Sequence, residues 1–172
     1  MLDEKTRKLY RIVAWVSGLA CLAVIVYGIA SATVGGSVGE NLVDVEFPLP
    51  YFAKPISYFS IASVAFFYCS ARLWEERISG WSKTTLSFLQ LFSFIVAFAS
   101  AYEVLYNFML WGSIFSAQVI SEGLTKANPS IAVFGLPVTW NLTFATKVFS
   151  SLFVISGYSA YFLRRFRSEG TV

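Results

Sequence analysis

The chain has 172 residues, of which 56% are hydrophobic, 18% aromatic and only 13% charged. A soluble domain carries about 25% charged residues, so this composition excludes a water-soluble globule and predicts an all-α integral membrane protein. The formal net charge is +3, and no basic run is interleaved with aromatic residues, which excludes a nucleic-acid partner.

The residue types also restrict the chemistry. The chain contains no histidine, which argues against histidine-ligated haem, zinc or copper and against histidine acid–base catalysis. Cys21 and Cys69 lie inside apolar runs, where they act as small hydrophobic residues rather than disulfide partners. No phosphate-binding glycine loop, Cys-x-x-Cys motif or serine nucleophile elbow is present. We therefore expect a non-enzymatic protein without a metal or cofactor.

Apolar segments of roughly the length that crosses a ~30 Å hydrocarbon core recur along the chain. They span residues 12–33, 56–73, 86–118 and 138–163. The first is too long for the 7–15 residue core of a signal peptide, so we expect an uncleaved anchor. Polar connections at 35–50 and 122–137 separate the segments, with prolines and glycines as turn signals. Residues 1–172 are therefore expected to form a single membrane domain.

The positive charges predict the orientation. The head, the connection at 72–83 and the tail carry nearly all Lys and Arg residues, whereas the other two connections carry Lys54 and Lys126 beside several acids. By the positive-inside rule, both termini are cytoplasmic and the chain crosses the membrane four times as an antiparallel bundle. The acidic pair Glu75 and Glu76 lies among arginines in the 72–83 connection, which favours a solvated charge cluster over acid–base chemistry.

Small residues recur on one face of the first segment at three- and four-residue steps. A face of this kind lets another helix approach closely. It indicates either a dimerisation seam or packing within the bundle. The helix-packing seam that we expect comprises Gly18, Cys21, Gly28 and Ala32.

A polar stripe marks the third segment. On a helix, its members fall at three- and four-residue steps among Phe, Leu, Val and Ile. Lipid does not tolerate such a stripe, so we expect the other helices to cover it, with this helix at the centre of the bundle. The stripe consists of Gln90, Ser93, Ala97, Ser100, Glu103 and Asn107.

Two charges fall inside apolar segments, Glu103 in the third and Lys147 in the fourth. Both lie at a similar height along antiparallel neighbours, which predicts an intramembrane pair with Tyr106, Asn107 and Asn141 around it. A lone charge in the core costs at least about 2.5–3.5 kcal/mol, and pairing offsets part of this. The pair is either a proton, ion or polar-substrate site, or a structural bridge that fixes helix register.

For function, small size and the absence of catalytic motifs favour an accessory or scaffold subunit that works through helix–helix contacts. Its expected partners are the lipid bilayer and either itself or other membrane subunits, in the cell membrane. The alternative is a small oligomeric transporter, channel, or lipid- or small-molecule-binding protein that uses Glu103 and Lys147.

Overall fold

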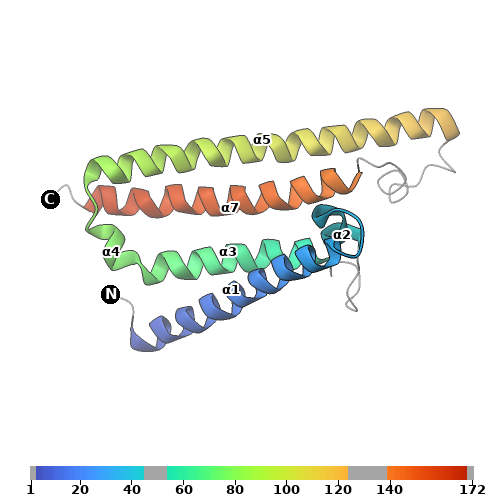
Figure 1. The fold of residues 1–172 in the computed structure, drawn as a ribbon. Helices are drawn as coiled ribbons and strands as arrows, with labels where there is room; N and C mark the ends of the chain where they lie inside the picture. The colour runs from blue at the N-terminus through green and yellow to red at the C-terminus, as the bar shows by residue number, and fades with distance from the viewer. Residues whose placement is uncertain (1–2, 45–53, 124–138, 170–172) are drawn as a thin grey trace.

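The computed structural model describes residues 3–44, 54–123 and 139–169 (Figure 1). These residues form helices and no strand. The helices are α1 (Glu4–Ala32), α2 (Val38–Asp44), α3 (Pro55–Leu73), α4 (Glu75–Ser79), α5 (Lys83–Glu122) and α7 (Thr139–Glu169). The helices α1, α3, α5 and α7 lie over the apolar segments noted at 12–33, 56–73, 86–118 and 138–163.

Within the described part, three helices are long and apolar enough to cross a membrane: α1, α3 and α5. This agrees with the expectation of a membrane protein. Helix α7 is as long as α1, but Lys147, several serines and Tyr158 interrupt its apolar run. A helix of this composition needs neighbours along much of its length to shield its polar groups from hydrocarbon.

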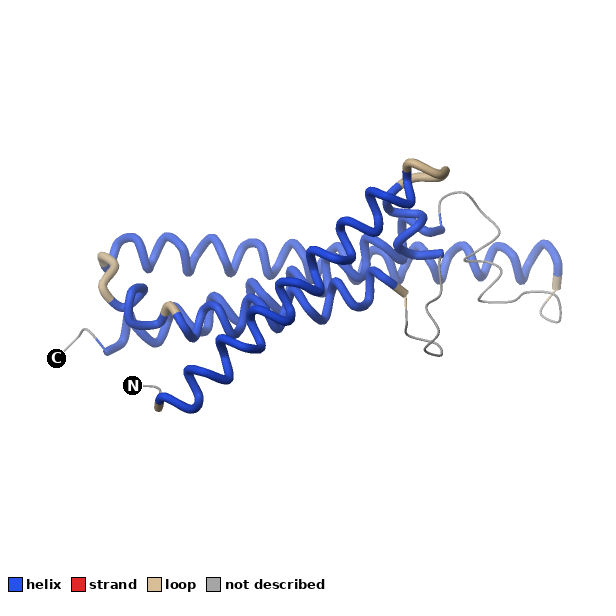
Figure 2. The backbone as a smooth tube through the Cα atoms, turned by 60° about the horizontal axis from the view of Figure 1, so that its bottom comes forward, coloured by secondary structure: helices blue, strands red, loops and turns tan. Residues whose placement is uncertain are grey.

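The long helices lie side by side in the order α1, α3, α7, α5 (Figure 1). Figure 2 shows that α1 crosses the others obliquely. The prediction that the third apolar segment lies at the centre is wrong, because α5 occupies an edge and packs mainly on α7. The inner members of the row are α3 and α7. A polar stripe requires cover, but a single neighbouring helix is enough to provide it.

The best-packed core lies at one end of the row. It consists of Leu42 and Val43 of α2 and Ile56 of α3, with Phe144 and Val148 of α7 against them. Within the connection predicted at 35–50, residues Val38–Asp44 thus form a helix that the sequence did not indicate. This short helix turns its apolar residues inward and closes the end of α1, α3 and α7. The connection predicted at 122–137 lies almost wholly outside the described residues.

Local signals explain where the helices start and stop. Pro55 occupies the first turn of α3, where its missing N–H costs nothing. Ser82 caps α5, and its hydroxyl oxygen accepts a hydrogen bond from the Thr85 N–H at 3.1 Å. Helix α5 ends at Gly123, whose φ of +86° is a conformation that other residues rarely adopt.

A charged network fixes the opposite end of the row. Glu75 of α4 pairs with Arg72 of α3 at 3.1 Å and with Arg165 of α7 at 3.5 Å. Its neighbour Glu76 pairs with Arg7 of α1 at 2.6 Å. The two acids are thus structural, and Glu75 is half-buried rather than freely solvated. Through them α4 holds the ends of three long helices together.

The small residues of the first segment are used inside the chain. A Cβ on Gly18 would approach the Phe66 ring of α3 to 3.2 Å, and one on Gly28 would approach Val38 and Leu42 of α2 to 3.1 Å. Cys21 Sγ lies 4.0 Å from the Phe59 carbonyl oxygen. Ala32 is half-buried at the end of α1. Gly18 and Gly28 therefore allow α3 and α2 to dock on α1.

The packing at Gly28 leads to a stability prediction. Gly28→Leu forces the Leu42 and Val38 side chains away from α1, so we expect the free energy of unfolding to fall by about 1–3 kcal/mol. Gly112→Leu is the control, because no atom lies within 4 Å of a Cβ at Gly112. The measurement is reversible unfolding in mixed micelles. Equal losses for both variants would contradict the docking of α2 at Gly28.

Candidate functional site

The polar stripe of α5 lies against α7. Ser100 and Asn107 are buried, at 3% and 7% exposure, and Leu86 and Ala97 are buried on the same side of the helix. Glu103 and Ser93 are half-buried. The opposite side of α5 carries exposed Phe, Leu and Ile residues, as expected of a surface that faces lipid. The α5–α7 seam is therefore the candidate functional site.

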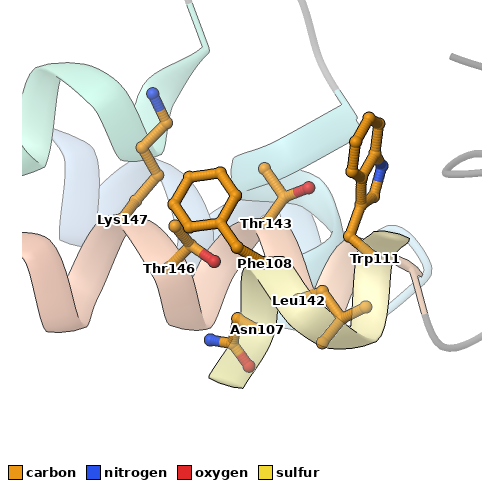
Figure 3. A pocket seen from close by; sticks show the side chains of 7 residues that line it. All are labelled: Asn107, Phe108, Trp111, Leu142, Thr143, Thr146 and Lys147. Carbon is orange, nitrogen blue, oxygen red and sulfur yellow. The ribbon is translucent and has the colours of Figure 1, made fainter. Parts of the chain in front are cut away.

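Toward the end of the seam nearer α2, an open and mostly apolar cavity of about 220 Å³ lies between the two helices. Polar groups from both helices line it, and aromatic rings from α5 form one wall (Figure 3). The lining residues are Asn107, Phe108, Trp111, Leu142, Thr143, Thr146 and Lys147. Two of them, Asn107 and Lys147, are among the site residues predicted from the sequence.

Asn107 and Lys147 have unsatisfied side-chain groups. The Asn107 Nδ2 is buried and has no hydrogen-bond partner within the described structure. The Lys147 ammonium takes part in none of the ion pairs or hydrogen bonds found among the described residues; only its backbone carbonyl is engaged, by Ser60 and Ser151. Figure 3 shows the ammonium and the amide on different sides of Phe108. Leaving a buried donor such as the Asn107 Nδ2 unpaired costs free energy, so an acceptor for this amide is expected here.

Glu103 and Lys147 do not form an ion pair in the described structure. Their heights match as predicted, because Lys147 shares the cavity with Asn107, one turn along α5 from Glu103. Their sides do not. At 100° per residue, Glu103 and Phe108 flank the seam on opposite sides. Lys147 lies on the Phe108 side. Spacing along the chain therefore predicted the height of Lys147 along the helix but not the direction in which it faces.

Two other predicted site residues lie away from the cavity. Tyr106 is exposed and stacks on Tyr102, with ring centroids 6.3 Å apart. Asn141 is exposed in the first turn of α7. Neither lines the cavity. Tyr102 and Tyr106 thus form an aromatic pair on the outer surface of α5 instead of supplying hydrogen bonds to a charge pair.

Residues that the sequence analysis did not single out complete the cavity. In the sequence, Phe108 is one of many phenylalanines in the third segment, which are typical of packing and lipid contact. Trp111 lies near a segment end, where tryptophan is typical of the membrane interface. Thr146 carried no signal of its own. A stripe at three- and four-residue steps through Asn107 and Trp111, opposite Thr143 and Lys147, could have indicated the group once α5 and α7 were paired.

The serines of the long helices are largely satisfied locally. Ser17, Ser151 and Ser159 each donate to the carbonyl four residues earlier, at 2.6–2.9 Å. Ser60 reaches across helices and donates to the Lys147 carbonyl at 3.3 Å. Because local bonds satisfy these hydroxyls, they need no ligand. Among the described residues, no group of three or more Cys, Asp or Glu is placed to hold a metal ion.

A second, larger groove of about 360 Å³ runs between α1 and α3. Apart from Arg11 at one end, its lining is apolar, and it includes Gly18, Leu22 and Phe66. It lacks the mixed donors of the α5–α7 cavity. No family model, curated protein or solved structure matches this chain, so the site is interpreted from its own chemistry.

The lack of a Glu103–Lys147 ion pair can be tested with a double-mutant cycle. For Glu103→Gln, Lys147→Met and the double variant, we expect effects on the free energy of unfolding to add within about 0.5 kcal/mol, as for sites without direct contact. The measurement is equilibrium unfolding in mixed micelles. A coupling energy of about 1 kcal/mol or more would mean that the two side chains interact.

Proposed function

We propose that this chain is an accessory subunit of the cell membrane that works through helix–helix contacts with other membrane subunits or with itself. The observation that carries this proposal is the outer end of α5. Helix α5 has 40 residues, about 60 Å at 1.5 Å per residue, whereas a bilayer with its headgroups is about 40–45 Å thick. An average tilt of about 20° shortens the helix by only a few ångströms.

The last turns of α5 extend past the first turn of α7 (Figure 1). Trp111 is beside Leu142 in the cavity lining, and α7 begins at Thr139, so the residues after Ile114 lie past the start of α7 and have no described helix next to them. This segment mixes exposed serines with apolar residues. Ile120 is 86% exposed, and Phe115 stacks on Trp111 with ring centroids 6.0 Å apart. An isoleucine this exposed on a helix end outside the hydrocarbon supports contact with another protein.

The proposal includes four membrane crossings with both termini in the cytoplasm. The distribution of positive charge supports this topology. Both described chain ends lie at the same end of the row, and that end carries Lys5, Lys8, Arg164 and Arg165. Helix α7 would be the fourth crossing despite its weaker hydropathy. Its Lys147 would lie near the outer boundary, where a long side chain reaches the headgroups.

The alternative function, an oligomeric transporter or channel, has weaker support. A row of helices one layer thick encloses no path by itself, so several copies would have to surround one. The α5–α7 cavity supports binding of a small group more directly than it supports passage.

Topology can be tested by cysteine labelling. In a Cys21→Ala, Cys69→Ala background, we expect Ser37→Cys to react with a membrane-impermeant maleimide on intact cells, and Ser79→Cys to react only after permeabilisation. Both serines are exposed, and they lie at opposite ends of the row. Reaction of both positions from the same side would contradict four crossings.

The accessory role can be tested by native mass spectrometry of the protein extracted in mild detergent from its own membrane. We expect a stoichiometric complex that Ile120→Asp dissociates, because a carboxylate would be buried in the contact. Val34→Asp is the matched control. Val34 is 91% exposed near the end of α1 at the same end of the row, and its replacement should leave the complex intact. A wild-type monomer, or equal loss in both variants, would refute α5 as the contact edge.

A further inference from the structure

We propose that the α5–α7 cavity binds the phosphate of an anionic phospholipid, with Lys147 as the charge that selects it. This inference does not depend on the accessory role. It specifies a ligand for a site whose polar groups have no counterpart among the described residues of the chain.

The chemistry of the lining points to an anionic acceptor. An ammonium offers three donors and no acceptor, and the buried Asn107 Nδ2 is an unused donor. Thr143 and Thr146 add hydroxyls next to them. Phosphate oxygens accept several hydrogen bonds at once, and bonds in which one partner is charged are shorter and stronger than neutral ones.

The position along the membrane fits a headgroup. Asn107 lies about 36 Å along α5 from Lys83, against a hydrocarbon thickness of about 30 Å. With Trp81 and Lys83 at one interface, the cavity therefore lies at the other interface, where phosphates are found. Trp111 on its wall is the residue type that favours this depth.

The volume and the lining of the cavity fit a lipid headgroup whose acyl chains remain outside the cavity. About 220 Å³ is below the range of about 300–1,000 Å³ that encloses a whole drug-sized ligand. Phe108 is 60% exposed and borders the cavity, so it offers an apolar surface for the glycerol and upper acyl chain. Glu103 lies on the opposite flank of the seam, which keeps a competing carboxylate away from Lys147.

The experiment uses the full chain mixed with equal amounts of phosphatidylglycerol and phosphatidylcholine that carry identical acyl chains. Native mass spectrometry then counts the lipids that each protein retains. We expect preferential retention of one phosphatidylglycerol. Lys147→Gln should weaken it about fivefold, the usual effect of one lysine on an anionic lipid, and Lys147→Arg should preserve it. Lys8→Gln is the control, because Lys8 is exposed near the other end of the row.

Asn107→Leu separates binding from folding. Removing an unpartnered buried amide should maintain or raise the unfolding temperature, whereas phosphatidylglycerol retention should fall. If Lys147→Gln does not fold, this variant still decides the question.

Three results would overturn the proposal. The first is equal retention of both lipids by the wild type. The second is equal loss in Lys147→Gln and Lys8→Gln. The third is displacement of the lipid by inorganic phosphate at the same concentration, which would make a free anion the ligand.

Discussion

The seam between α5 and α7 is the contact on which the rest of this structure depends, because α5 packs mainly on α7. In hydrocarbon, unpaired polar groups are costly, so the stripe from Gln90 to Asn107 has to be covered. Helix α7 covers it and at the same time packs Phe144 and Val148 into the core formed with α2 and α3. Helix α7 thus packs against α5 on one face and against α2 and α3 on the other. This explains why α7 is less apolar than its neighbours and lies inside the row.

The charged network explains how α5 reaches this position. Only the short α4 separates α3 and α5 along the chain, yet α7 lies between them in space (Figure 1). The connection must therefore pass across the end of α7. Glu75 of α4 stabilises this path, because it pairs with Arg72 of α3 on one side and with Arg165 of α7 on the other. Such half-exposed pairs contribute little stability singly, but a shared carboxylate fixes the direction in which α4 leaves α3.

The sequence was sufficient to predict the long helices but not to predict which helices pack against one another. Apolar length located the long helices, and the three- and four-residue spacing of the stripe identified the buried side of α5. Helix α2 was missed because Glu40 and Asp44 gave its segment a polar composition. Its inward packing depends on Gly28 of another helix. Likewise, residue spacing placed Glu103 and Lys147 at one height, but only the rotation of α7 about its axis decides which flank Lys147 faces.

The outer end of α5 and the cavity have a common cause in the mismatch of helix lengths. Helix α7 begins at Thr139, about one turn beyond the level of Trp111, so α5 has no described helix beside it past that point. Below that level the seam is closed by Ser100 and Ala97, which are small enough for the helices to approach. Above it, bulkier side chains hold the helices apart and leave space beside Lys147. A shorter α5 would remove the exposed Ile120, and a longer α7 would cover it, but neither would pair the Asn107 amide. The proposed partner surface and the proposed lipid site therefore share an origin in the fold, yet each is expected to be lost by mutation without the other.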